Sequence, residues 1–144
     1  YDKAEPRLRY ALAFNPDDAS ILNDLAILLS VLGRNDEAAR LLERAADLAP
    51  LRADILVNLG KVHTERKDYI SAHMRLARAT QTAPDFPRGW LARSELDRRR
   101  GFASAAAASA RRAVELENSS EAYRALAAAL AIKPRPGAGT KARP

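Results

Sequence analysis

Hydrophobic positions recur three and four residues apart along most of the chain, which is the spacing expected for one face of an α-helix. Ile21, Leu22, Leu25, Leu28 and Leu29 show this spacing within a single stretch. A second helical stretch follows each first one, so the chain consists of a series of paired helices. The pattern therefore predicts an all-α fold.

The paired helices repeat at a constant interval along the chain. Prolines mark this interval plainly, because Pro16, Pro50 and Pro84 stand 34 positions apart. Residues at the same position in successive units form columns. Columns with the same 34-residue spacing are Ala4, Ala38, Ala72 and Ala106; Leu8, Leu42 and Leu76; Leu22, Leu56 and Trp90; and Ala26, Gly60 and Ser94. A proline cannot continue a helix interior, so it ends the second helix of each unit. The sequence thus predicts stacked units of two antiparallel helices.

Turn residues and helix starts agree with this division. Gly33 and Gly101 stand between the two helices of a unit, where the backbone needs a conformation that glycine adopts readily. Asp17 and Asp18 begin the first complete unit, where carboxylates favour the helix dipole and cap the first amides. These residues predict a helix start at the beginning of a unit and a turn near its middle.

The unit resembles the tetratricopeptide repeat, whose motif is W-x₂-L-G-x₂-Y, then A-x₃-F, then P. The first complete unit fills the motif positions with Leu22, Leu25, Ala26, Leu29, Ala38, Leu42, Ala45 and Pro50. The third unit departs from the motif, because Arg93 and Asp97 occupy positions that are usually apolar and Ala110 replaces a large residue. The resemblance implies a right-handed α-solenoid of stacked helix hairpins, the superhelix of this family.

The resemblance divides the chain into six segments. They are the second helix of a truncated repeat at residues 1–16, repeats at 17–50, 51–84 and 85–118, a capping helix at 119–133 and a disordered basic tail at 134–144. We interpret the chain as a fragment of a longer protein, and its composition, rich in alanine and arginine, as bacterial. In the capping helix, Ala122, Ala125 and Ala129 are expected on the outer side.

Positive charge is unevenly spread along the 144 residues, whose net charge is +6. Residues 133–144 hold four cations and no acid, so residues 1–132 carry a net charge of only +2. Residues 86–114 contain seven arginines and two acids. A nucleic-acid site needs cations on one face, preferably with stacking aromatics, and only Phe86, Trp90 and Phe102 accompany this cluster. Nucleic acid is therefore not the favoured partner.

Candidate catalytic and metal-binding groups are few. The chain has no cysteine and two histidines, His63 and His73, which are predicted on different helices of one unit with no third ligand implied. His63 occupies the tyrosine position of the motif, where a packed side chain is expected. We expect no catalytic residue, no metal and no cofactor. The longest apolar run, residues 125–132, is far short of the ~20 residues that a membrane-spanning helix needs.

In the resembled family, the first helix of each repeat lines a concave groove that holds peptides or helices of partner proteins. Helical phase predicts the groove residues Asn23, Asp24, Ile27, Asp54, Val57, Asn58, Lys61, Arg88, Leu91, Glu95 and Arg99. The asparagine amides can hydrogen-bond a peptide backbone, and Arg88 and Arg99 can receive a carboxylate. The clamp by which some family members hold chaperone tails is not matched, because Asn23, Ile27 and Ala92 stand at three of its positions.

Non-catalytic protein recognition is the favoured function, with the chain acting as a scaffold or adaptor for a peptide or helical segment. An alternative is the substrate-recruiting or oligomerising arm of a larger enzyme, such as a glycosyltransferase or sulfotransferase. Nucleic-acid binding is a third hypothesis and predicts steep salt dependence. Leu8 and Leu12, at the exposed end of the predicted solenoid, leave end-to-end stacking of two chains open as a route to a homo-oligomer.

Overall fold

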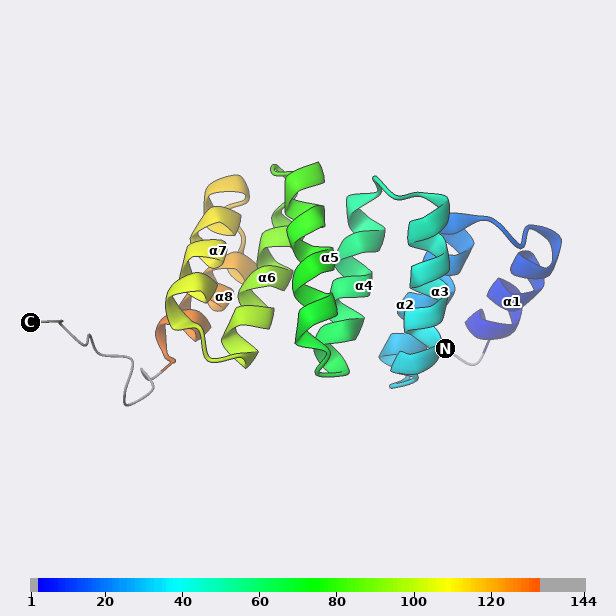
Figure 1. Cartoon of the computed structure of the whole chain (residues 1–144), viewed down its shortest axis with the longest axis horizontal. Helices are drawn as coiled ribbons and strands as arrows, with labels where there is room; N and C mark the ends of the chain where they lie inside the picture. Colours follow the sequence, from blue (N-terminus) through cyan, green and yellow to red (C-terminus); the bar gives the residue numbers. More distant parts are fainter. Residues whose placement is uncertain (1–2, 133–144) are drawn as a thin grey trace, which may run out of the picture.

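The computed structural model describes residues 3–132 as a row of eight α-helices (Figure 1). These helices are α1 (Ala4–Phe14), α2 (Ala19–Val31), α3 (Asn35–Leu48), α4 (Ala53–Glu65), α5 (Tyr69–Thr82), α6 (Pro87–Arg99), α7 (Ala103–Leu116) and α8 (Ser120–Leu130). No strand occurs in this part of the chain, and the all-α prediction is confirmed. The tail predicted at residues 134–144 lies outside the described residues.

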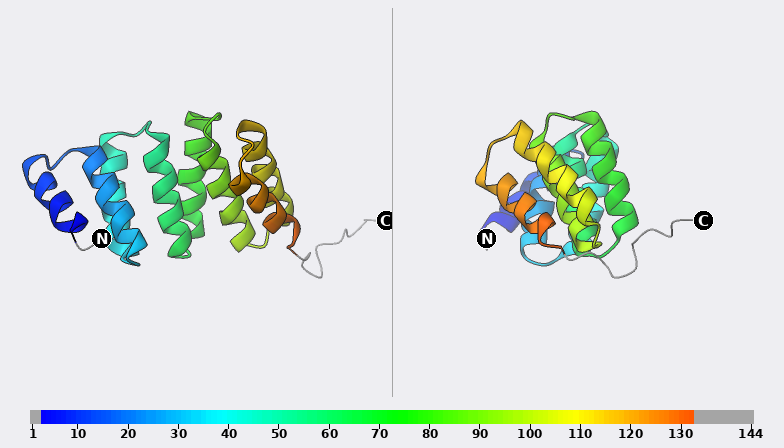
Figure 2. Two further views of the ribbon diagram at one scale, coloured as in Figure 1. Left: turned by 180° about the vertical axis from the view of Figure 1, so that it is seen from behind. Right: turned by 90° about the vertical axis from the view of Figure 1, so that its left-hand side faces the viewer.

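Neighbouring helices pair into hairpins, α2 with α3, α4 with α5 and α6 with α7, and α7 also packs on α8. The first helices of successive hairpins touch one another as well, because α4 contacts both α2 and α6, and α6 contacts α8. Between residues 3 and 132, the second helices α3, α5 and α7 make no such contacts with one another. The row therefore curves with α2, α4, α6 and α8 on its inside (Figure 2). We call these four the inner helices, and the surface that they line the inner groove.

Leucines form the core within and between the hairpins. Those from α2 to α5 that are at most 1% exposed are Leu22, Leu25, Leu29, Leu42, Leu56, Leu59 and Leu76. Together with alanines, they build one apolar cluster that runs from α2 to α6. Full burial of one such side chain contributes about 1.5–3 kcal/mol, so these leucines are a major source of stability.

Gly60 lets α4 approach α5 closely. A Cβ atom at this position would lie 2.5 Å from the Cγ atom of Leu76, which is too short for any real contact. The same column holds Ala26 one unit earlier and Ser94 one unit later, and both are buried. Small residues in this column thus set the spacing between the two helices of a hairpin.

The third hairpin has a thinner core than the first two. Ala110 of α7 occupies the position that Leu76 holds one unit earlier and is fully buried, so a methyl group replaces a leucine side chain there. Ala106 and Ala107 pack instead with Ala129 of α8 in a second, smaller apolar cluster. The hydrophobic core is therefore divided between α6 and α7.

The helix α8 covers the C-terminal end of the described chain with a face of small residues. Ala122 and Ala129 are fully buried, and Ala125 is half-buried. The prediction that these alanines lie on the outer side is therefore wrong. The physical reason is that small side chains allow α8 to pack closely against both α6 and α7, which it contacts.

Side-chain caps begin three of the helices. The Asp18 carboxylate accepts hydrogen bonds from the backbone amides of Ser20 and Ile21 at 2.8 and 3.1 Å, so the helix start predicted there is confirmed. Asp68 and Ser119 cap α5 and α8 in the same way. Each cap satisfies backbone amides that a helix leaves without a partner at its N-terminus.

Each hairpin turns through a residue in the left-handed conformation. Gly33, Lys67 and Gly101 have φ angles of 77°, 61° and 79°, and they occupy equivalent positions in successive units. After Gly33, the amide of Arg34 donates to the Leu29 carbonyl at 2.8 Å, and equivalent bonds close α4 and α6. The turns predicted at the two glycines are confirmed, whereas the middle turn forces a lysine into a conformation that strongly favours glycine.

Replacing Lys67 with glycine should stabilise the fold by about 1 kcal/mol, because glycine adopts the left-handed conformation without the steric cost of a Cβ atom. Replacing Gly33 with alanine should destabilise it by about the same amount. No atom lies within 4 Å of a Cβ built at Gly33, so the backbone conformation alone causes the loss. Urea unfolding followed by circular dichroism measures both changes. Shifts of the same sign would contradict this explanation.

Candidate functional site

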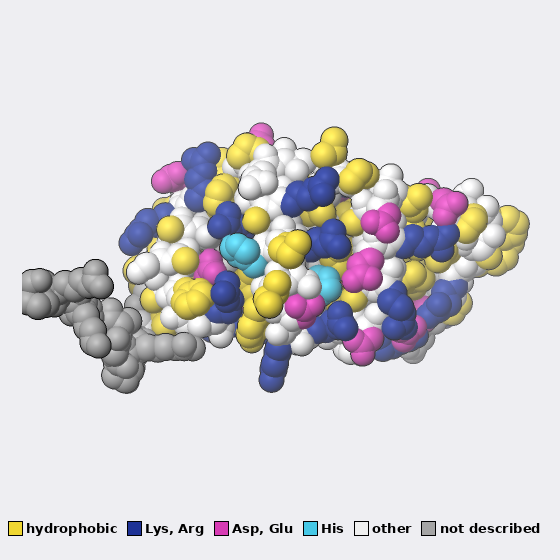
Figure 3. All heavy atoms as spheres, viewed as in Figure 1, with side chains coloured by type: hydrophobic (Ala, Val, Ile, Leu, Met, Phe, Trp, Pro, Cys, Tyr) yellow, Lys and Arg dark blue, Asp and Glu magenta, His cyan; other side chains and the backbone are white. Residues whose placement is uncertain are grey.

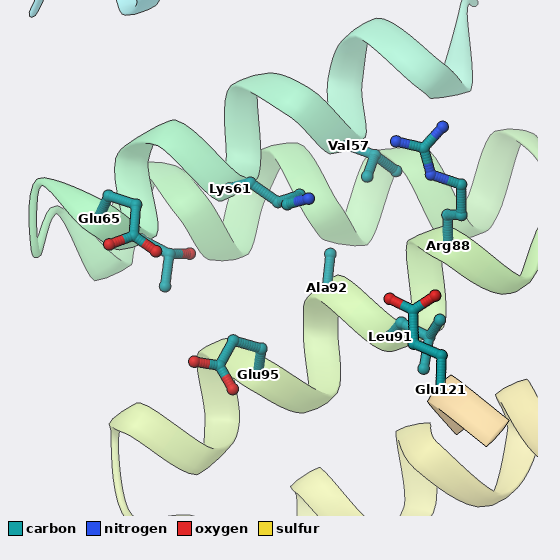
Figure 4. A pocket seen from close by; sticks show the side chains of 9 residues that line it. Val57, Lys61, Glu65, Arg88, Leu91, Ala92, Glu95 and Glu121 are labelled. Carbon is teal, nitrogen blue, oxygen red and sulfur yellow. The ribbon is translucent and has the colours of Figure 1, made fainter. Parts of the chain in front are cut away.

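The inner groove contains a pocket of about 270 Å³ between α4, α6 and the start of α8, which we call the central pocket (Figure 4). It is lined by Val57, Lys61, Thr64, Glu65, Arg88, Leu91, Ala92, Glu95 and Glu121. Val57, Thr64 and Ala92 are less than a tenth exposed. Largely apolar atoms therefore form the floor of the central pocket, and charged side chains form its rim.

A smaller pocket of about 120 Å³ lies between α2 and α4, and we call it the N-terminal pocket. It is lined by Ile27, Ser30, Val31, Leu42, Asn58, Lys61 and Val62. Ile27 and Val31 are 40% and 60% exposed, so this pocket presents apolar surface to the solvent. Lys61 lines both pockets, which are therefore neighbours along the groove.

These two pockets bring together many of the residues that helical phase predicts for the groove. Those that line a pocket are Ile27, Val57, Asn58, Lys61, Arg88, Leu91 and Glu95. Five lining residues were not predicted from the sequence, namely Thr64 and Glu121 of the central pocket and Ser30, Leu42 and Val62 of the N-terminal pocket. Thr64 follows Lys61 by three residues and Val57 by seven, so helical spacing could have identified it. Glu121 belongs to the segment interpreted only as a cap.

Asn23 and Asn58 lie against each other between α2 and α4. The Asn58 side-chain amide donates to the Asn23 side-chain oxygen at 2.8 Å, and the two residues are 8% and 6% exposed. Asn23 in turn donates to Asp24 at 3.4 Å. Part of the hydrogen-bonding capacity that was expected to serve a peptide is thus used to hold two inner helices together.

Asp54, another predicted groove residue, is paired within the chain. The Nη2 atom of Arg52 lies 2.6 Å from its Oδ2 atom, and Arg52 also donates to the Ser20 hydroxyl at 2.7 Å. The hydrogen bond that Arg52 donates to Asp54 lowers the pKa of this aspartate below its usual value, although partial burial opposes the effect. Asp54 therefore helps to link α4 to α2 and does not line either pocket.

Arg99 neutralises two acids at the rim of the central pocket. Its guanidinium lies 2.7 Å from Glu65 Oε1 and 2.7 Å from Glu95 Oε1, and Arg98 also pairs with Glu95 at 2.7 Å. Burial alone would raise the pKa of Glu95, but the hydrogen bonds from Arg98 and Arg99 lower it below its usual value. Arg99 was expected to receive a carboxylate from a ligand. In the structure it already holds two from the chain itself.

Lys61 and Arg88 differ from Arg99, because neither forms an ion pair with any residue between 3 and 132. The Arg88 guanidinium lies 6.0 Å from the centre of the Phe86 ring. Figure 4 shows the Lys61 side chain extending toward Val57 and away from Glu65. The rim of the central pocket thus offers two cations that the described chain leaves without a carboxylate partner.

A core position that is leucine in the first hairpin is polar in the other two. Leu29, His63 and Asp97 occupy this position in successive units, and each is less than a tenth exposed. The Nδ1 atom of His63 lies 3.3 Å from Asp68 Oδ2, yet it makes no hydrogen bond in the part of the chain that the structure describes. Burial lowers the pKa of His63, although the negative charge of Asp68 opposes this effect.

Asp97 and Arg93 are the polar residues that depart from the motif in the third hairpin. Burial raises the pKa of Asp97, while Arg93 and Arg100 oppose the rise. Arg100 Nη1 lies 3.9 Å from Asp97 Oδ1. Arg93 donates to the Thr80 hydroxyl at 3.1 Å, and its guanidinium lies 5.3 Å from the centre of the Trp90 ring. Both residues have partners within the chain, and neither lines a pocket of the groove.

The outer face, formed by α3, α5 and α7, carries basic and acidic side chains close together (Figure 3). Between residues 3 and 132, no three potential metal ligands of the His, Cys, Asp or Glu type come together. No helix in the same range has the length and apolar character needed to cross a membrane.

These features define the class of protein as an α-solenoid of stacked helical hairpins with an inner groove. The sequence profile of the tetratricopeptide repeat family matches residues 17–85, which include the hairpins α2–α3 and α4–α5. This match confirms the resemblance to the tetratricopeptide repeat that the motif positions indicated.

Solved structures share this fold. A thermophilic tetratricopeptide repeat protein of Thermus thermophilus superposes with a TM-score of 0.82 at 25% identity, over 90% of this chain and 72% of that one. The first tetratricopeptide repeat domain of Spaghetti, bound to the HSP90 peptide SRMEEVD, superposes with a TM-score of 0.71 at 20% identity. The match covers 77% of this chain and 89% of that domain. YrrB, described as having an unusual peptide-binding site, superposes with a TM-score of 0.73 at 22% identity. The match covers 88% of this chain and 66% of that one. No curated protein sequence matches this chain significantly.

Acidification should destabilise the fold through His63. Because its pKa is lowered in the folded chain, the unfolded chain binds the proton more tightly, and stability is lost as the pH falls below about 6.5. Replacing His63 with leucine, the residue at the equivalent position 29, should remove this loss. Thermal melts at pH 7.5 and 5.5 measure it, with His73→Gln as the exposed control. The explanation fails if His63→Leu loses as much stability as the parent.

Asp97 should have the opposite dependence on pH. Since burial raises its pKa, the folded chain binds the proton more tightly than the unfolded chain, and stability is lost as the pH rises above about 4. Asp97→Asn should therefore melt at a higher temperature than the parent at pH 7, with the difference shrinking toward pH 4. Asp85→Asn, an exposed aspartate, is the matched control. An equal gain at both pH values would rule out the titration of Asp97 as the cause.

Proposed function

We propose that this chain is a non-catalytic protein-interaction module that binds a peptide or helical segment of a partner in its inner groove. One observation carries the proposal, namely the central pocket itself. It combines an apolar floor at Val57 and Ala92 with two cations, Lys61 and Arg88, that have no carboxylate partner within residues 3–132. A peptide can fill such a pocket with an apolar side chain and satisfy the cations with polar groups.

The chemistry of the pocket matches what peptide recognition needs. Burial of an apolar side chain on the pocket floor supplies affinity, and charged groups at the rim fix orientation and exclude the wrong partner. The Asn23–Asn58 hydrogen bond and the Arg99–Glu65 ion pair hold neighbouring inner helices at a fixed separation. A groove that is already formed loses little conformational entropy when a ligand binds.

The comparisons support the same function. Tetratricopeptide repeats generally act as protein-interaction modules, and the family profile covers the hairpins that build the N-terminal pocket and part of the central pocket. One similar solved domain is bound to a peptide, and another protein is described as having a peptide-binding site. These relatives motivate a search for peptide ligands of this chain.

A library of random linear peptides displayed on phage tests the proposal. The parent chain should enrich peptides, and a groove variant carrying Arg88→Glu and Leu91→Ala should retain them at least tenfold less well, because it loses a cation and apolar surface at the pocket. Arg78→Glu, on the exposed surface of α5, makes the same charge change outside the groove and should leave retention unchanged.

All three proteins must first show equal helicity by circular dichroism. Equal retention by the parent and the groove variant would contradict binding in the inner groove. A library that yields no enriched peptide on the parent would contradict peptide recognition itself.

A further inference from the structure

Lys61 lies between two apolar pockets, and this arrangement favours a ligand with an acidic residue between two apolar ones. Ile27 and Val31 provide the apolar surface of the N-terminal pocket, and Val57 and Leu91 that of the central pocket. Lys61 lines both. Resting on the proposed function, we infer that the groove binds an extended internal segment of a partner in which two apolar residues, three positions apart, flank an acidic residue that pairs with Lys61.

The spacing of the two pockets favours an extended ligand. Each pocket lies between neighbouring inner helices, and packed helices are separated by about 8–10 Å. In a polyproline II segment, residues i and i+3 lie on the same side about 9.3 Å apart, since each residue rises about 3.1 Å. Same-side residues of a strand, at i and i+2, are only about 6.6 Å apart. The polyproline II geometry therefore places apolar side chains at i and i+3 in both pockets together.

Competition inside the chain explains why the charge of Lys61 remains available. Glu65 follows Lys61 by four residues on α4, a spacing at which lysine and glutamate commonly pair on a helix. Arg99 of α6 binds Glu65 instead, at 3.1 and 2.7 Å. Figure 4 shows the Lys61 side chain directed away from Glu65, over the pocket floor. The acidic partner of Lys61 is therefore expected from the ligand.

The position of the acid within the ligand follows from the same geometry. With residues i and i+3 in the pockets, the side chains at i+1 and i+2 point toward the walls of the groove, because a polyproline II segment has three residues per turn. The long alkyl stem of Lys61 lets its ammonium group reach either position while the stem covers apolar surface. A basic residue at the same place would meet Lys61 and be rejected.

Designed peptides test this inference on the full chain. The probes are labelled nine-residue peptides, acetylated and amidated at their ends, with two leucines separated by one to six residues and with Asp, Asn or Lys between them. Fluorescence polarisation should give the tightest binding for two intervening residues with Asp. Replacing Asp with Lys should weaken binding about five- to tenfold. The blocked C-terminus ensures that a free terminal carboxylate plays no part.

A charge reversal tests whether Lys61 is the residue that recognises the acidic side chain of the ligand. Lys61→Glu should invert the preference, so that the Lys-containing peptide binds more tightly than the Asp-containing one. Arg78→Glu makes a similar charge change on the outer helix α5 and should leave the preference for Asp intact. Because Lys61 is exposed, the reversal should not disturb the core, and equal helicity checks this.

The outcomes separate this inference from the proposed function. If phage-selected peptides depend on Arg88 and Leu91 but the designed series shows no preference for Asp or for two intervening residues, the inference is overturned and the proposed function stands. An unchanged preference in Lys61→Glu also overturns it. If no peptide distinguishes the parent from the groove variant, both the inference and the proposed function fail.

Discussion

Burial of leucine side chains between successive hairpins is the interaction on which the rest of this structure depends. A single hairpin cannot bury its apolar faces alone, so each one gains stability only by stacking on the next in the constant register of the repeat. The same stacking brings α2, α4 and α6 into direct contact along the inside of the curve. The separation of the groove pockets therefore follows from core packing. A ligand meets a surface whose spacing was already fixed by the fold.

Much of the fold can be predicted from local chemistry that recurs in columns. Proline, glycine and aspartate act on the backbone near them, so Pro50, Gly33 and Asp18 indicate a boundary, a turn and a helix start without knowledge of the tertiary structure. Lys67 carries no local turn signal of its own, and only the 34-residue register, which places it at the position of Gly33 and Gly101, indicates a turn there. The orientation of α8 was missed because a helix rich in alanine shows little contrast between its faces. Ala129 is equally compatible with a buried or an exposed position.

For the groove residues, the direction of a side chain can be predicted from the sequence, but its contacts cannot. Helical phase fixes the direction of each Cα–Cβ bond, which is why residues such as Val57 and Leu91 were identified from sequence and lie at a pocket. Phase does not fix where a long side chain ends or what it meets on another helix. The pairs Arg99–Glu65 and Asn58–Asn23 each join residues of two different hairpins, and each uses groups that sequence reasoning left available to a ligand. Such partnerships depend on tertiary packing.

The ion pairs at the rim matter more for specificity than for stability. Arg99, Glu65 and Glu95 are about a third to a half exposed, and pairs of this kind contribute at most about 1 kcal/mol because water screens them. Their effect on the groove is larger, since each acid held by Arg99 no longer competes for a nearby lysine. Lys61 therefore keeps its charge free over an apolar floor, where the surrounding low-polarity surface strengthens its attraction to a carboxylate. Weak contacts within the chain thus determine which charge the groove presents to a partner.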